Sequence, residues 1–71
     1  MIVKGRQVVR VLTGQGWTMA GIRDRSEVLV HADYPDVSLV VPVHGNPLKP
    51  AVLERILDQA GITQERFAEL I

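Results

Sequence analysis

The residues best placed to do chemistry together are Arg23, Arg25, Ser26 and Glu27, which fall within five consecutive positions. Arginine binds phosphate through a planar guanidinium that stays charged at all ordinary pH values. A neighbouring carboxylate can accept a proton if its surroundings favour its neutral form. The segment could therefore support proton transfer beside a bound phosphate, with Glu27 as the base. The alternative is a solvated Glu27 in an ion pair with Arg23 or Arg25, which would stabilise the charged carboxylate and weaken it as a base.

The chain has two histidines, His31 and His44, and no cysteine. His31 lies four residues beyond Glu27, which is about 13 Å along a strand at 3.3 Å per residue, so the two cannot act at one point. We expect His31 to be a polar residue at a strand end. His44 lies in a loop before a helix, where its ring could accept hydrogen bonds from the amides of the first helical turn. Lys49, in the same loop, is a plausible phosphate contact.

Neither a metal centre nor a stacking platform is predicted. Two histidines without a carboxylate at a recognisable ligand spacing do not indicate a metal site, and thiolate chemistry is excluded. The aromatic residues are Trp17, Tyr34 and Phe67, which lie far apart in the sequence. We expect Trp17 and Phe67 to pack in or beside the core, and we expect no platform for stacking bases.

The whole chain, residues 1–71, is short enough that we expect a single domain. Its net charge is zero, which argues against nucleic-acid binding by overall charge alone. The charge is unevenly distributed, because residues 1–25 contain five basic side chains and one acidic side chain. No apolar stretch approaches the roughly 18 to 20 residues that span a bilayer. We therefore expect a cytoplasmic protein with no membrane segment.

The hydrophobic pattern predicts a helix, three strands and two further helices. Apolar residues recur at three and four positions in a first helix that ends near Gly14 or Gly16. Short runs rich in β-branched residues at 17–23, 26–32 and 37–43 predict an antiparallel meander. Pro50 suits the first turn of a second helix, Gly61 its end, and Thr63 the cap of a short last helix. The predicted fold class is α+β, in the order αβββα with a small terminal helix.

The helices should cover one face of this sheet. Along the second strand, Val28, Val30 and Ala32 alternate with a set that includes Glu27 and His31. This alternation predicts that the first set faces the core and that Glu27, Leu29 and His31 point outward. In the second helix, one apolar face should bury against the sheet, and it consists of Leu53, Ile56, Leu57 and Ala60.

Three segments in order resemble a known family. They are VVRVL at 8–12 with Gly16 and Trp17, VVPVH at 40–44, and Leu48 followed by LERILDQAGI at 53–62. Together they are similar to the HicA (YcfA-like) family of small toxins. The resemblance implies a fold like that of double-stranded-RNA-binding domains, ribosome-independent mRNA cleavage, and neutralisation by a HicB-type antitoxin encoded alongside. We expect no cofactor.

The resemblance also implies that activity depends on a histidine in a Gly-Ser-His motif at the start of the second strand. This chain has Arg25, Ser26 and Glu27 there. Two hypotheses follow: a toxin-type domain with Glu27 in the catalytic position, or a catalytically inactive module that binds RNA or a protein. The candidate RNA contacts are Arg23, Arg25, Ser26, His31, His44 and Lys49. The oligomeric state is left open.

Overall fold

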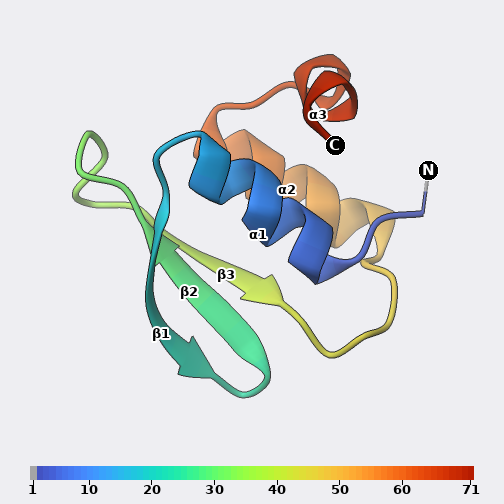
Figure 1. The fold of residues 1–71 in the computed structure, drawn as a ribbon, viewed down its shortest axis with the longest axis horizontal. Coiled ribbons are helices and arrows are strands. Elements are labelled where there is room, and N and C mark those ends of the chain that lie inside the picture. Colours follow the sequence, from blue (N-terminus) through green and yellow to red (C-terminus); the bar gives the residue numbers. More distant parts are fainter. Residues whose placement is uncertain (1) are drawn as a thin grey trace.

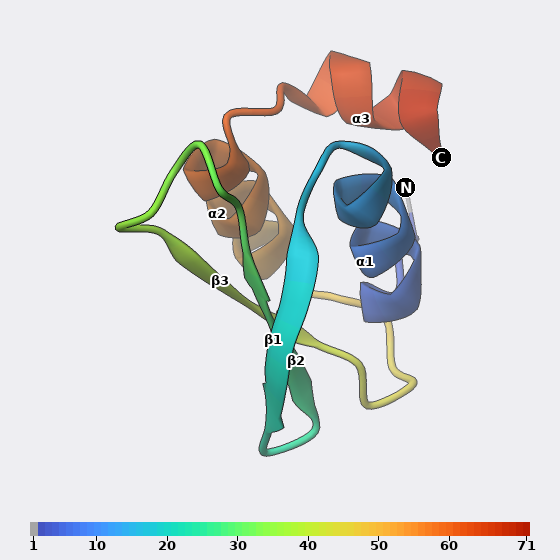
Figure 2. The same ribbon diagram turned by 60° about the vertical axis from the view of Figure 1, so that its left-hand side comes forward.

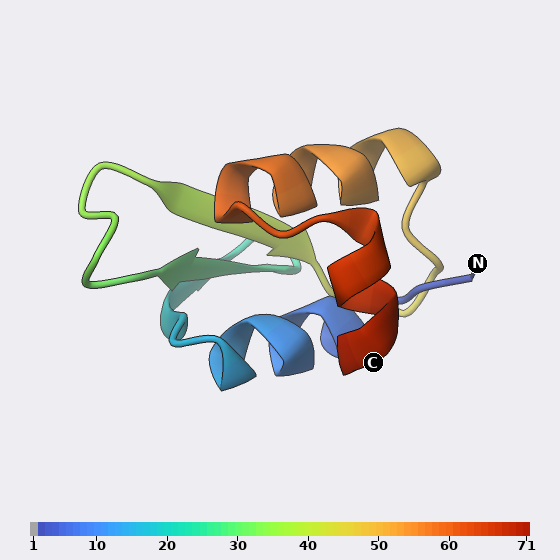
Figure 3. The same ribbon diagram turned by 90° about the horizontal axis from the view of Figure 1, so that it is seen from above.

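The computed structural model describes residues 2–71 and has the element order that the sequence predicts (Figure 1). The elements are α1 (Gly5–Gly14), β1 (Thr18–Arg23), β2 (Ser26–Val30), β3 (Ser38–Pro42), α2 (Pro50–Ala60) and α3 (Gln64–Leu70). Helices α1 and α2 pack on the sheet, and α3 crosses them on the side away from it (Figures 2 and 3). The α+β class, with helices on one face of an antiparallel sheet, is confirmed.

The three strands form a meander in the order β1-β2-β3, antiparallel throughout. The second and third strands are shorter than predicted, because pairing stops at Val30 and begins again at Ser38. An irregularity between Met19 and Gly21 interrupts the register of β1 against β2. The pairing of β3 with β2 is regular.

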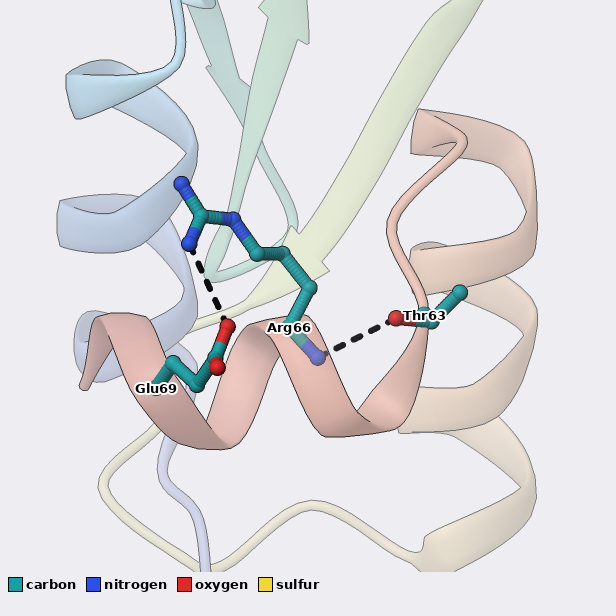
Figure 4. Close-up of polar contacts among 3 residues, drawn as sticks. All are labelled: Thr63, Arg66 and Glu69. Carbon is teal, nitrogen blue, oxygen red and sulfur yellow. Dashed lines mark hydrogen bonds and ion pairs between the residues drawn. The ribbon is translucent and has the colours of Figure 1, made fainter.

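The helix boundaries follow local signals. Helix α1 ends at Gly14, and Pro50 occupies the first turn of α2. Gly61 terminates α2 with a φ of 73°, a backbone conformation that glycine adopts without a Cβ clash. The Thr63 hydroxyl accepts a hydrogen bond from the Arg66 amide at 3.1 Å and caps α3 (Figure 4).

The core lies between the sheet and the helices, and α3 closes it. Trp17 and Phe67 are buried in it, as predicted. The predicted face of α2 also packs inward, with Leu53 half-buried at its edge. The side chains that are least accessible to solvent are Phe67, Leu12, Leu29, Leu39, Ile56, Leu57, Val3, Val8 and Val41.

The predicted orientation of β2 is wrong. Leu29 is fully buried, and its neighbour across the sheet is the buried Leu39. Val28 is instead paired with Val40, which is 42% exposed on the face turned away from the helices. Directly paired residues share a face, so the helices cover the face that carries Leu29 and leave Val28 and Val30 on the outer face.

Glu27 and His31 share the parity of Leu29, but both lie near the margin of the helix-covered face. Each is only half-buried, and Ala32 is exposed beyond the end of the strand. The strand is so short that one leucine at its centre is enough to anchor it. The polar residues on either side of Leu29 therefore do not have to point outward, and this is why strict alternation assigned the wrong face.

Two contacts hold the chain beyond β3 against the start of α1. A Cβ on Gly5 would collide with the carbonyl oxygen of Pro42, so only glycine allows this approach. The Leu48 amide donates to the Val3 carbonyl at 2.8 Å, and Lys4 forms a β-bridge with Pro47. The loop of residues 43–49 is thereby fixed beside the start of α1. None of the helices in residues 2–71 combines the length and apolar character needed to cross a membrane.

Candidate functional site

The β1–β2 turn is built from two non-glycine residues in the left-handed region. Asp24 has a φ of 48° and Arg25 a φ of 61°, the combination found in a tight type I′ hairpin. Aspartate tolerates this conformation, whereas a long side chain such as arginine is strained in it. The Arg25 carbonyl accepts a hydrogen bond from the Val43 amide at 2.9 Å. The turn is therefore joined to the first residue after β3.

Glu27 lies close to this turn on the helix-covered face, between Ile22 of β1 and Val41 of β3. Its predicted position on the outer face is wrong for the reason given above. Among residues 2–71 the one ion pair joins Arg66 to Glu69 at 3.2 Å (Figure 4). The expected alternative, an ion pair between Glu27 and Arg23 or Arg25, is not formed in this part of the chain.

His44 lies in the loop that follows β3. Its Nδ1 accepts a hydrogen bond from the Asn46 amide at 3.2 Å, which assigns the proton of the neutral ring to Nε2. The prediction that this ring would accept from the first turn of α2 is wrong. The Val52 and Leu53 amides of that turn donate to the Lys49 carbonyl instead.

A groove of about 390 Å³ opens beside this loop. It is lined in part by His44 and Lys49, both exposed residues. Its other lining residues are Pro42, Asn46, Pro47, Leu48 and Val52. The groove is lined by one imidazole-bearing residue and one lysine, so it suits an anionic ligand.

The hairpin turn and the 43–49 loop lie at the same end of the sheet (Figure 1). We call this the basic end, defined as residues 4–6, 23–27 and 43–49. It contains five basic side chains, from Lys4, Arg6, Arg23, Arg25 and Lys49, against the carboxylates of Asp24 and Glu27. The bond from Val43 to Arg25 thus places the segment with Arg23, Arg25, Ser26 and Glu27 at the same end of the sheet as the loop that carries His44 and Lys49.

His31 lies at the opposite end of the sheet. Its Nδ1 accepts a hydrogen bond from the Asp33 amide at 3.0 Å, and its Nε2 lies 3.2 Å from the Gln15 carbonyl oxygen. A Cβ on Gly16, whose φ is 98°, would lie 2.6 Å from Nε2. Both ring nitrogens of this half-buried residue lie within hydrogen-bond distance of backbone atoms. This supports the expectation that His31 is a polar residue with a structural role at a strand end.

The aromatic residues are less dispersed than the sequence suggested. The Trp17 and Tyr34 rings stack with centroids 6.0 Å apart and an interplanar angle of 22°. The His31 ring packs edge-on against Trp17 at 5.2 Å. The available signal was the strand register: Thr18 pairs with Val30 in an antiparallel sheet, so Trp17, which precedes Thr18, lies beside the residues that follow Val30. Trp17 is only 2% exposed, so it presents no face for a base, whereas Tyr34 is 50% exposed.

No group of three or more histidine, aspartate or glutamate side chains in residues 2–71 could hold a metal ion. The groups at the basic end are suited to binding phosphate and moving a proton. The arginines and Lys49 supply positive charge, and Glu27 supplies a carboxylate without an ion-pair partner in the described residues.

Comparison with protein families supports the resemblance found in the sequence. The model of a family described as the HicA toxin of bacterial toxin–antitoxin matches residues 5–62. The match runs from the first residue of α1 to just beyond the end of α2, and it includes the hairpin turn and the 43–49 loop. Comparison with curated proteins returned no match. Since the family model covers most of the chain, this protein belongs to the HicA toxin family, whose members are mRNA interferase toxins of toxin–antitoxin systems.

Proposed function

We propose that residues 1–71 form a single HicA-type toxin domain that binds RNA through the basic end. The observation that supports the proposal is that the turn with Arg23 and Arg25 lies at the same end of the sheet as the loop with His44 and Lys49. Single-stranded and double-stranded RNA both present a line of phosphates. A surface with a local excess of positive charge can bind them even when the net charge of the protein is zero. Such a domain acts in the cytoplasm, where mRNA is found, and is held inactive by a HicB-type antitoxin.

The proposed reaction is metal-independent transfer within the RNA backbone. Glu27 takes the proton of a 2′-hydroxyl, and the oxygen attacks the adjacent phosphorus to form a 2′,3′-cyclic phosphate. The bond to the 5′ oxygen breaks, and that oxygen takes a proton from water to become a 5′ hydroxyl. The arginines stabilise the charge that develops on the phosphate. The absence of an ion pair from Glu27 to Arg23 or Arg25 in residues 2–71 leaves the carboxylate available as the proton acceptor.

The family motif has a histidine at this position, and imidazole accepts a proton near neutral pH more readily than a carboxylate does. We therefore expect slow cleavage. The second candidate is a catalytically inactive domain that keeps the RNA surface and the antitoxin partner. The same observation, Glu27 in the place of the histidine, favours it. Ser26 matches the motif and we include it in the RNA surface, whereas we assign His31 a structural role at the other end of the sheet.

Cleavage of a labelled mRNA by three purified forms separates these candidates. If Glu27 is the base, Glu27→Gln should reduce the rate by about 10²- to 10⁴-fold. Restoring the motif with Arg25→Gly and Glu27→His should raise the rate above that of the unmodified chain. Glu65→Gln, on exposed α3, is the matched control and should have no effect. RNA binding without cleavage by any form would establish the inactive domain, and an unmodified chain that neither binds nor cleaves RNA would contradict both candidates.

A further inference from the structure

The two edges of the sheet differ in how they are protected. Unpaired strand edges attract other strands, and proteins usually block them with bulges or charged side chains. The β1 edge has both, namely the irregularity between Met19 and Gly21 and the charge of Arg23. The β3 edge has the sequence SLVVP, with no charged residue and regular pairing to β2. Within residues 2–71, no strand lies beside it (Figure 2).

The hydrogen-bonding pattern identifies which backbone groups of β3 point away from the sheet. The Val43 amide donates inward to the Arg25 carbonyl. Backbone groups alternate in direction along an antiparallel strand, so Val41 and Leu39 also bond inward to β2. The amides and carbonyls of Val40 and Ser38 therefore point outward. They form a short row of alternating donors and acceptors with the spacing of a β-ladder.

This row lies beside a groove. Its volume is about 290 Å³, and it is lined by Ser38 and Val40 of β3 and by Arg55 and Gln59 of α2. Arg55 and Gln59 lie one turn apart on the exposed side of α2, so the helix lines one side of the groove without covering the strand edge. Val40 is 42% exposed, and it pairs with Val28 on the outer face.

We propose that the β3 edge is the docking site for an extended strand of the antitoxin, which adds as a fourth strand and places a carboxylate against Arg55. This inference rests on the proposed function for the existence of that partner. Strand addition derives affinity from backbone bonds and specificity from the side chains beside them. Arg55 is the one charged residue among the four that line the groove, so a complementary strand carries an acidic residue there.

Two other occupants fit less well. A second copy paired through the same edge about a two-fold axis near Val40 would bring two Arg55 side chains together, and the strand SLVVP carries no carboxylate to separate them. RNA matches neither the alternating donors and acceptors of the edge nor the apolar Val40 beside them. The antitoxin strand satisfies the backbone groups, the apolar position and the charge together.

Amide hydrogen exchange of the full chain, alone and bound to the HicB-type antitoxin, tests the proposal directly. The outward amide of Val40 should exchange at least about 100-fold more slowly in the complex, because a new inter-strand bond protects it. The amide of Val41 is the internal control, since it is bonded to β2 in both states. Slowed exchange at Val40 on adding RNA instead would overturn the choice of occupant.

Affinity measurements on variants add a second test. Val40→Pro removes the outward amide at a position where an edge strand tolerates proline, and it should weaken antitoxin binding about tenfold or more. Val40→Thr keeps that amide and should bind more tightly than Val40→Pro, so the difference between the two variants measures the contribution of the amide. Arg55→Glu should also weaken binding about tenfold, whereas Arg66→Glu on α3 should not. Arg55 is an exposed residue, so Arg55→Glu remains informative if Val40→Pro does not fold.

The outcomes separate this inference from the proposed function. An unmodified chain that binds no HicB-type antitoxin contradicts the proposed partner and the inference with it. An unmodified chain that binds tightly, with Val40 exchange unchanged and with Val40→Pro and Arg55→Glu unaffected, overturns only the docking site. Protection of Val40 together with loss of binding in these two variants supports the strand addition.

Discussion

The two ends of the sheet each carry one histidine with the same local hydrogen bond, yet the two rings differ in what surrounds them. In both, Nδ1 accepts from the amide two residues later, at 3.0 Å for His31 and 3.2 Å for His44. The His31 ring also meets Gln15, Trp17 and Tyr34. His44 instead lines an open groove together with Lys49. A histidine's role therefore depends on what packs against its second nitrogen, which the local sequence does not reveal.

The charged side chains also differ between the two ends of the sheet. The loop of residues 31–37 carries the carboxylates of Asp33 and Asp36 and no lysine or arginine, while the basic end carries five basic side chains. In the proposed function, the aromatic and acidic end has a structural role and the basic end binds the ligand. A single β-meander produces this separation, because alternate turns of a meander lie at opposite ends of its strands.

The largest expected effect concerns Leu29, the buried residue at the centre of β2, between the two ends of the sheet. Leu29→Ala should lower the free energy of unfolding by about 2 to 5 kcal/mol, because it leaves a cavity between the sheet and the helices. Val28→Ala, one residue earlier on the outer face, should cost much less. Chemical denaturation of the two variants measures the difference. Equal losses, or a larger loss at Val28, would contradict the orientation of β2 described here.

The comparison between the histidines predicts a smaller difference. His31→Ala should cost about 1 to 3 kcal/mol, because it removes two backbone contacts and an aromatic contact with Trp17. His44→Ala should change stability by less than about 0.5 kcal/mol, since its ring is exposed. Thermal unfolding of both variants at neutral pH tests this. Similar destabilisation by the two changes would show that the ends do not differ as proposed.

The hairpin turn gives the smallest expected stability change. Arg25→Gly should raise the free energy of unfolding by about 0.5 to 1 kcal/mol, because it relieves the strain of arginine at a φ of 61°. Asp24→Asn is the matched control, since both residues tolerate the left-handed region. The same Arg25→Gly protein should bind RNA more weakly. A loss of stability on removing this arginine would mean that its side chain has a structural role.

The elements of the fold could be predicted because their signals are local. Pro50, Gly61 and Thr63 mark helix ends through backbone geometry and capping, so each was correctly placed without knowledge of the tertiary structure. The family could be identified because its motifs occur in order along the chain, and the family match confirms it.

The orientation of β2 and the surroundings of the candidate residues depend on long-range packing. Alternation offered two possible faces for β2, and only its pairing with Leu39 and Val41 resolves which one the helices cover. The stacking of Trp17 on Tyr34 requires the β1–β2 register. Bringing His44 close to Arg25 requires the bond from Val43 to the hairpin turn. The candidate residues could therefore be predicted from the sequence, but the end of the sheet at which each one lies could not.

The most direct test of the account is an RNA titration at two salt concentrations with two double variants of equal charge change. Arg23→Ala with Arg25→Ala removes two positive charges from the basic end, and Arg55→Ala with Arg66→Ala removes two from α2 and α3. For double-stranded RNA, we expect the first variant to bind more weakly than the unmodified chain. The slope of the logarithm of its binding constant against the logarithm of salt concentration should also fall in magnitude by up to about two. The second variant should bind like the unmodified chain. Equal losses in the two variants, or binding that does not depend on salt, would contradict the claim that the basic end binds RNA.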